Sequence, residues 1–106
     1  MVIILERNIQ RVTNGKLDEL ETLDSQFNEI ETKLGYPPKK RFRYIVGGFD
    51  TQTIVIERQW ESLAKMEDLM TKAFLDPEIQ KLNSKLIKIV DWQRIELLLP
   101  HPPFPS

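Results

Sequence analysis

The sequence predicts one α+β domain whose elements follow in the order β-α-β-β-α-β. Four short segments combine β-branched and aromatic residues in alternation with polar ones, and two longer segments repeat apolar residues every three or four positions. The two middle strands are joined by a short connection that contains two glycines. Such a connection favours an antiparallel hairpin, because parallel neighbours need a crossover of about a dozen residues or more.

The first segment, Val2–Arg11, is predicted to be a strand that is covered on both sides near its start. Alternate residues of a strand point to opposite faces of a sheet. One face carries Ile3, Leu5 and Ile9. The other face carries Val2, Ile4, Glu6 and Asn8. Both faces begin apolar, whereas an uncovered face is usually polar throughout.

A helix is predicted after Thr13-Asn14-Gly15, which ends this strand. Its apolar residues fall within an arc of about 80° at the helical repeat; they are Leu20, Leu23, Phe27, Ile30 and Leu34. We expect Asn14 to cap the first turn and Gly35 to end the helix in a left-handed conformation.

A hairpin is predicted next, with strands at Arg41–Val46 and Thr53–Trp60. Both segments are rich in β-branched and aromatic residues. Gly47-Gly48 supplies backbone freedom for the turn between them. No helix follows these glycines directly, so they do not resemble a dinucleotide-binding loop.

The second helical segment follows Ser62, which is expected to be its N-cap. Its apolar residues recur at spacings of three and four; they are Leu63, Met66, Met70, Ala73 and Phe74. Asp76-Pro77 predicts a break and a restart, because Asp is a good N-cap and Pro suits the first helical position. The restarted stripe consists of Ile79, Leu82, Leu86 and Ile89.

The last strand is predicted at Trp92–Leu99, and the proline-rich segment that follows cannot continue a central strand. The order is that of a ferredoxin-like domain, a four-stranded antiparallel sheet with two helices on one face. We expect the open face to carry apolar residues mixed with Glu6, Arg94 and Arg58. A monomer would expose this face, which predicts a homodimer through the open sheet face.

The length and composition of the chain exclude several classes of protein and of functional site. The 106 residues predict a single domain, 1–106. The net charge of −1 gives no reason to expect nucleic acid or an anionic membrane as partner. The chain has no cysteine, which excludes disulfides, thiolate metal sites and a thiol nucleophile. No apolar run approaches the length of a membrane span or a secretory core, so a cytoplasmic protein is expected.

The segment Trp60-Glu61-Ser62-Leu63-Ala64, followed by Asp76-Pro77-Glu78 and a last strand ending in Leu98-Leu99-Pro100, resembles NIPSNAP-like proteins. These belong to the dimeric α+β barrel superfamily. The resemblance implies a dimeric barrel whose relatives include cofactor-free monooxygenases, heme-degrading enzymes and many proteins of unassigned activity. The only histidine, His101, lies in the proline-rich tail rather than on a helix. The heme ligand of those relatives therefore has no counterpart here, and no cofactor or metal is expected.

Five residues are candidates for binding a ligand: Glu6, Tyr44, Arg58, Trp60 and Arg94. Strand positions can place the charged ones inside a barrel, where burial shifts a carboxyl pKa; the alternative is ion pairing between strands or subunits. For Trp60 and also Trp92 the alternative is packing. Three functions stay open: a small-molecule binding protein without catalysis, a cofactor-independent oxygenase-like enzyme, and a structural interaction module. A roomy cavity with a few convergent polar groups would favour the first.

Overall fold

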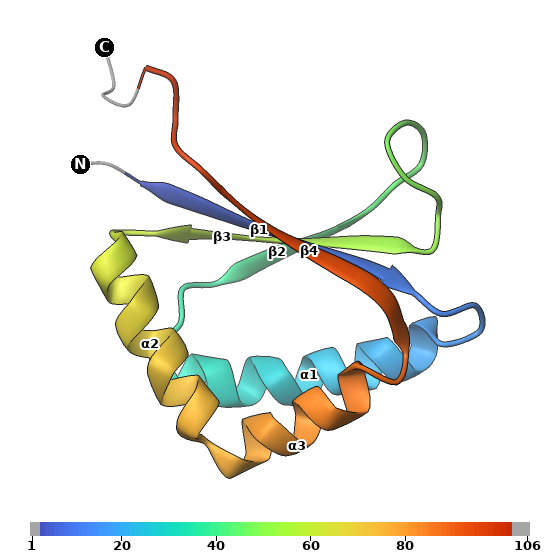
Figure 1. Ribbon diagram of the computed structural model, residues 1–106, viewed down its shortest axis with the longest axis horizontal. Helices are drawn as coiled ribbons and strands as arrows, with labels where there is room; N and C mark the ends of the chain where they lie inside the picture. Colours follow the sequence, from blue (N-terminus) through green and yellow to red (C-terminus); the bar gives the residue numbers. More distant parts are fainter. Residues whose placement is uncertain (1–2, 103–106) are drawn as a thin grey trace.

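A computed structural model describes residues 3–102 of the protein, so Val2 of the predicted first strand and Phe104 of the tail lie outside the described residues. The strands form one antiparallel sheet in the order β2-β3-β1-β4, and the helices lie on one of its faces (Figure 1). The elements are β1 (Ile4–Val12), α1 (Leu17–Leu34), β2 (Lys39–Arg43), β3 (Thr53–Trp60), α2 (Leu63–Leu75), α3 (Pro77–Leu86) and β4 (Val90–Leu98). The predicted ferredoxin-like sheet is confirmed.

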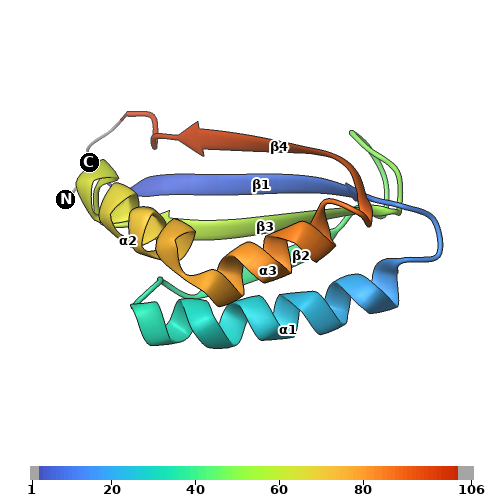
Figure 2. The same ribbon diagram turned by 60° about the horizontal axis from the view of Figure 1, so that its bottom comes forward.

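Three helices, rather than two, cover the inner face of the sheet, because the predicted break at Asp76-Pro77 separates α2 from α3 completely. The Asp76 carboxylate accepts hydrogen bonds from the backbone N–H groups of Glu78, at 2.8 Å, and Ile79, at 3.3 Å. Pro77 occupies the first turn of α3. The two helices meet at an angle, and α3 runs beside α1 (Figure 2).

The other helix ends follow local chemistry. Ser62 caps α2, with its hydroxyl accepting from the Lys65 N–H at 3.1 Å, and Gly35 ends α1 at a φ of 95°, both as predicted. The expected cap by Asn14 is wrong. The α1 helix begins at Leu17 without a side-chain cap, and the Asn14 side chain accepts a hydrogen bond from Arg11 instead.

The register of the sheet decides which side chains face the helices. Glu6 lies opposite Arg58 and Asn8 lies opposite Ile56, on the same face as Ile4 and Trp60. The prediction that Glu6 and Arg58 would lie on the open face is therefore wrong. Arg94 lies opposite Ile9 and faces away from the helices, as predicted. The error arises because β1 carries polar residues on its covered face.

The hydrophobic core consists of two clusters under the two ends of β1. One is built around Val12, Leu20, Leu23, Ile54, Leu82 and Ile89. The other is built around Ile4, Trp60 and Leu69. Between Ile4 and Val12, the inner face of β1 presents Glu6, Asn8 and Gln10. The sheet thus covers a polar zone between two apolar ones.

The connection between β2 and β3 is a long loop, residues 44–52, rather than a tight turn. The β2 strand ends at Arg43, three residues earlier than predicted, and Gly47 and Gly48 both adopt positive φ. The Phe49 ring contacts Tyr44, with centroids 5.5 Å apart, and Trp92 of β4, at 5.2 Å. Because β3 and β1 lie between β2 and β4 in the sheet, this aromatic bridge links the β2–β3 loop to the opposite edge strand.

Candidate functional site

A cavity of about 320 Å³ lies between the sheet and the helices, and we call it the sheet–helix cavity. All four strands and all three helices contribute to its wall. Its lining residues are Glu6, Asn8, Gln10, Leu20, Asp24, Phe27, Glu31, Lys39, Ile56, Arg58, Phe74, Asn83, Leu86, Ile87, Gln93 and Ile95. Its volume is near the lower end of the range of about 300–1,000 Å³ that is usual for small-molecule sites.

Two other hollows have similar volumes, so volume alone does not single out this site. One, of about 300 Å³, lies on the open face beside Tyr44 and Val55. The other, of about 340 Å³, lies on the outer side of α1 and α3 and is lined largely by exposed charged residues. The sheet–helix cavity differs from both because it combines buried polar side chains with an apolar wall.

An ion-pair network closes the end of the cavity between β2, β3 and α1. The Lys39 Nζ lies 2.6 Å from an Asp24 oxygen and 3.4 Å from a Glu31 oxygen. An Arg58 guanidinium nitrogen donates to the same Glu31 oxygen at 2.6 Å. The Arg58 Nε also donates to the backbone carbonyl of Pro37 at 3.2 Å. Charges of opposite sign thus satisfy one another away from solvent, as buried charges must.

A second contact joins Glu6 to Trp60. The indole N–H donates to the Glu6 carboxylate at 2.9 Å, with the two residues 6 % and 1 % exposed. Tyr36 packs edge-on against the Trp60 ring at 5.3 Å, and the Arg58 guanidinium lies 4.9 Å from the centre of the Tyr36 ring. Burial, followed by the Glu31 charge, raises the pKa of Tyr36 to about 12, despite the opposing effect of Arg58.

The middle of the cavity wall is formed by side-chain amides. Asn8 and Gln10 project from the central strand β1 toward the helices. The Asn8 Oδ1 and the Gln10 Oε1 are buried without a hydrogen-bond partner in the described residues. The Gln10 Nε2 makes one long contact, 3.4 Å, to Gln93 on β4. Buried polar atoms without partners are rare in folded proteins, so these amides are the least satisfied groups in the cavity.

The mouth of the cavity opens beside the edge strand β4 and is mainly apolar, with Gln93 as its exposed polar residue. Phe74, Ile87 and Ile95 line it and are 67 %, 71 % and 58 % exposed. Leu86 and Phe27 continue this apolar surface inward. A ligand that enters here meets apolar side chains first and the amides of β1 next.

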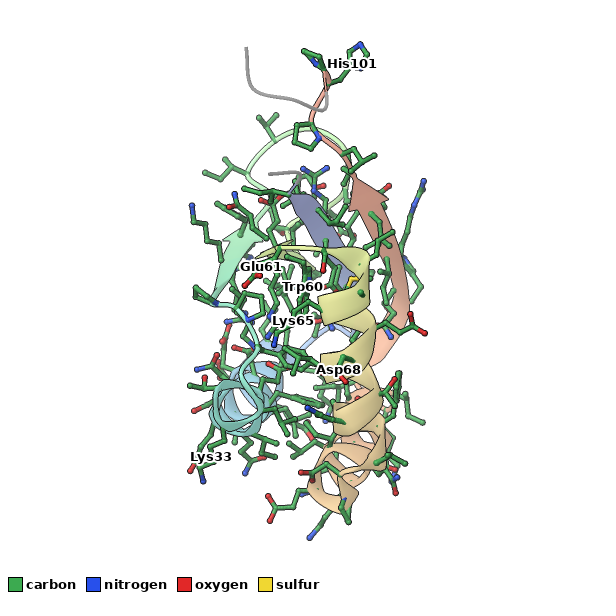
Figure 3. All side chains as sticks on the ribbon, turned by 90° about the vertical axis from the view of Figure 1, so that its left-hand side faces the viewer. Lys33, Trp60, Glu61, Lys65, Asp68 and His101 are labelled. Atoms are coloured by element: carbon green, nitrogen blue, oxygen red, sulfur yellow. The ribbon has the colours of Figure 1, made fainter. Side chains whose placement is uncertain are left out.

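The structure brings together three of the five predicted ligand-binding residues. Glu6, Arg58 and Trp60 share the helix-facing side of the sheet, although Trp60 lies beside the cavity rather than in its lining. Tyr44 and Arg94 lie elsewhere: Tyr44 packs in the loop on the open face, and Arg94 is exposed, with its Nε 3.2 Å from Glu96. Figure 3 shows His101 beyond the sheet, far from Trp60, in an exposed position.

The sequence analysis missed Gln10. Asn8 is of a residue type suited to the site of a cofactor-free monooxygenase, but its place near the end of a strand favours a polar edge or turn residue. A partial signal was present, because one face of β1 carries three polar residues in succession: Glu6, Asn8 and Gln10. The other face alternates apolar and basic residues, from Leu5 to Arg11, so the sequence alone does not say which face the helices cover. Lys39, Asp24 and Glu31 had no comparable sequence signal, since their meeting depends on the packing of α1 against β2.

Within residues 3–102, no three His, Asp or Glu side chains are grouped as a metal site would require. None of the helices described here has the length and apolar character that would let it cross a membrane.

The fold resembles solved NIPSNAP structures. A NIPSNAP family protein from Agrobacterium tumefaciens matches with a TM-score of 0.79 and 22% identity, over 92% of this chain and 85% of that one. An uncharacterized NIPSNAP domain protein from Burkholderia xenovorans matches with a TM-score of 0.80 and 17% identity, over 97% and 99%. A second A. tumefaciens NIPSNAP family protein, of unknown function, gives 0.77 and 19%, over 92% and 87%.

No protein-family model and no curated protein matches the sequence. The structural matches establish that this chain has a NIPSNAP-like fold, as the resemblance of the Trp60–Ala64 segment predicts.

Proposed function

We propose that this NIPSNAP-like protein binds a small organic molecule in the sheet–helix cavity and works as a homodimer. The observation that carries the proposal is the pair of buried, unpartnered amide oxygens of Asn8 and Gln10 in the wall of an open cavity. A structural module gains nothing from such a pair, because an apolar core of the same shape is more stable. A ligand supplies the missing hydrogen bonds.

Binding is favoured over catalysis by the state of the charged groups. Each carboxylate in the cavity lining is in contact with a donor or cation: Glu6 with Trp60, Asp24 with Lys39, and Glu31 with Arg58. A general base needs a proton acceptor that is free to reach the substrate. An oxygenase-like activity, in which the substrate itself supplies the electrons, is the alternative, and turnover of a bound molecule would distinguish it.

The homodimer rests on the open face of the sheet. Arg7 lies 2.9 Å from Glu57 and 4.0 Å from Glu96 across neighbouring strands, and the apolar Leu98 is also exposed on this face. A face that carries both signs of charge can match its own copy about a two-fold axis, which is the commonest geometry of homodimers. We therefore propose a second copy of this chain as the partner.

The cavity is tested with ethylbenzene as probe, titrated into the ¹⁵N-labelled full chain and followed by NMR. We expect shifts of the side-chain amide signals of Asn8 and Gln10. Ile95→Trp should obstruct the mouth and weaken binding at least tenfold. Ile45→Trp is the matched control, because Ile45 is an exposed loop residue outside the cavity lining.

The proposal fails if neither ethylbenzene nor an analogue that carries a polar head group shifts the cavity signals, or if these probes shift only signals of the open face such as that of Val55. It also fails if both tryptophan variants bind the probe as the parent does. Native mass spectrometry of the freshly purified protein adds a direct readout, since a bound molecule appears as extra mass on the folded chain.

A further inference from the structure

We infer that the sheet–helix cavity selects an uncharged ligand with an N–H or O–H head and an apolar body. The head lies against Asn8 and Gln10, and the body points to the mouth. This inference rests on the proposed binding function and specifies the chemical class of the ligand. It follows from three features of the cavity: its charges, its amides and its mouth.

The charged groups of the cavity lining already have partners. The lining carries three carboxylates and two cations: Glu6 accepts from Trp60, Asp24 pairs with Lys39, and Glu31 pairs with Arg58. Arg41, which lies behind the lining, contacts Asp24 at 3.4 Å and pairs with Glu21 at 2.5 Å. A charged ligand would lose its hydration without gaining a free counter-charge, which makes its burial costly.

The amides are the groups that still have hydrogen-bonding capacity. Asn8 and Gln10 are two positions apart on β1, so their side chains lie next to each other on one face. Gln10 is only 3 % exposed, and the residue opposite it on the neighbouring strand β3 is the apolar Ile54. Rotation about the last bond of a carboxamide exchanges its oxygen and its NH₂. The pair can thus accept from a ligand N–H or O–H and donate to an acceptor on the same head.

The mouth sets the orientation of the ligand. Phe74, Ile87 and Ile95 are exposed and apolar, while Gln10 is almost fully buried. A ligand with a polar head and an apolar body gains most when the head goes in first. The volume of about 320 Å³ favours a body of one or two rings.

The test uses four matched probes: ethylbenzene, 4-ethylphenol, 4-ethylanisole and 4-ethylbenzoate. All four share the ethylphenyl body. Ethylbenzene has no polar head, 4-ethylphenol has an O–H group, 4-ethylanisole has an ether oxygen without a proton, and 4-ethylbenzoate has a charged carboxylate. Dissociation constants come from NMR titration of the full chain. We expect 4-ethylphenol to bind about tenfold more tightly than 4-ethylanisole or 4-ethylbenzoate, which corresponds to about 1.4 kcal/mol.

Two variants assign this preference to the amides. Gln10→Met and Asn8→Leu keep the approximate side-chain size and remove the amide. Each should reduce the 4-ethylphenol preference over 4-ethylanisole to threefold or less, while ethylbenzene binds at least as well as before. Gln59→Met is the matched control, because Gln59 is an exposed residue of β3 on the open face and should retain the preference.

Folding does not obscure this test. The Gln10 oxygen has no partner and the Gln10 Nε2 makes only a long contact to Gln93, so Gln10→Met should leave the melting temperature equal to or above that of the parent. The probe series on the unmodified chain is a second, independent measurement. Equal binding of 4-ethylphenol and 4-ethylanisole, or tighter binding of 4-ethylbenzoate, would overturn the inference and leave the binding function standing. A cavity that takes none of the four probes would overturn both.

Discussion

The Glu6 carboxylate accepts the indole N–H of Trp60 at 2.9 Å, and this contact ties the start of β1 to the end of β3. Trp60 also packs on Ile4 and Leu69, so the same ring joins the sheet to α2. Glu6 itself lines the sheet–helix cavity. The buried Glu6 side chain therefore has two roles. One of its oxygens stabilises the packing of Trp60 between β1, β3 and α2, and the side chain also lines the candidate site.

Replacing Glu6 measures how much its hydrogen bond to Trp60 contributes to stability. Glu6→Leu should lower the free energy of unfolding by about 1–3 kcal/mol, because the Trp60 N–H is left buried without an acceptor. Glu6→Gln keeps an oxygen in place and should cost clearly less. Urea denaturation of the two variants and the parent measures the difference. Equal losses for Leu and Gln would show that the hydrogen bond does not stabilise the junction.

The Glu31 carboxylate is expected to be the most sensitive member of the ion-pair network. Glu31→Gln leaves Arg58 without its acid partner and Lys39 with Asp24 alone. We expect a loss of about 3 kcal/mol, the lower end of the range for breaking a buried pair. Asp68→Asn is the control, since Asp68 and Lys72 form an exposed pair on α2. Its loss should stay below about 0.5 kcal/mol in the same urea series.

Tyr36 predicts a specific alkaline dependence of stability. Its pKa in the folded chain is about 12, above the value of about 10 for an unfolded tyrosine, chiefly because the phenol is buried. The folded state therefore holds the phenolic proton more tightly than the unfolded state does. The resulting stability is complete below pH 10 and is lost as the pH rises from about 10 to about 12.

This dependence is measured against Tyr36→Phe. The melting temperature of the parent should fall relative to that of the variant as the pH rises from about 10 to about 12, while other alkaline effects cancel. Tyr44 is the only other tyrosine, so the absorbance at 295 nm of Tyr44→Phe reports Tyr36 alone. A phenolate signal that is complete near pH 10 would contradict the raised pKa.

The proposed dimer makes a prediction about two adjacent residues of β4. Leu98 lies on the open face opposite Leu5, whereas Leu97 lies on the helix-facing side opposite Glu6. Leu98→Lys should convert the dimer to a monomer, because it places a charge beside Arg7 in the interface. Leu97→Lys should leave the dimer intact. Light scattering coupled to size exclusion gives the mass, and a parent protein of 12.5 kDa in solution would refute the dimer.

The fold was largely predictable because its signals are local. The hairpin strand Thr53–Trp60, the Ser62 cap and the Asp76-Pro77 break each depend on residues close in sequence, and each is confirmed. The connection between β2 and β3 is longer than the short turn that the sequence predicts, because β2 ends at Arg43. Two glycines predict a turn, but Phe49 finds its partner Trp92 far along the chain, and only the folded sheet brings the two together.

The candidate site was less predictable because its residues come together only when distant segments pack against one another. Alternation along β1 assigns residues to two faces but does not say which face the helices cover. Glu6 was therefore expected on the open face, although it lies on the covered one. Polar residues on a covered face contradict the usual pattern of a half-buried strand, and such contradictions concentrate at functional sites.

The aromatic bridge of Tyr44, Phe49 and Trp92 has a consequence for a newly made chain. Phe49 joins Tyr44 to Trp92 of β4, and Ile9 and Val55 on the open face are buried within a single chain. In the proposed dimer, a subunit that has not yet met another copy would therefore expose less apolar surface than the open face carries. This would protect the subunits of the proposed dimer most at low synthesis rates, at which they wait longest before pairing.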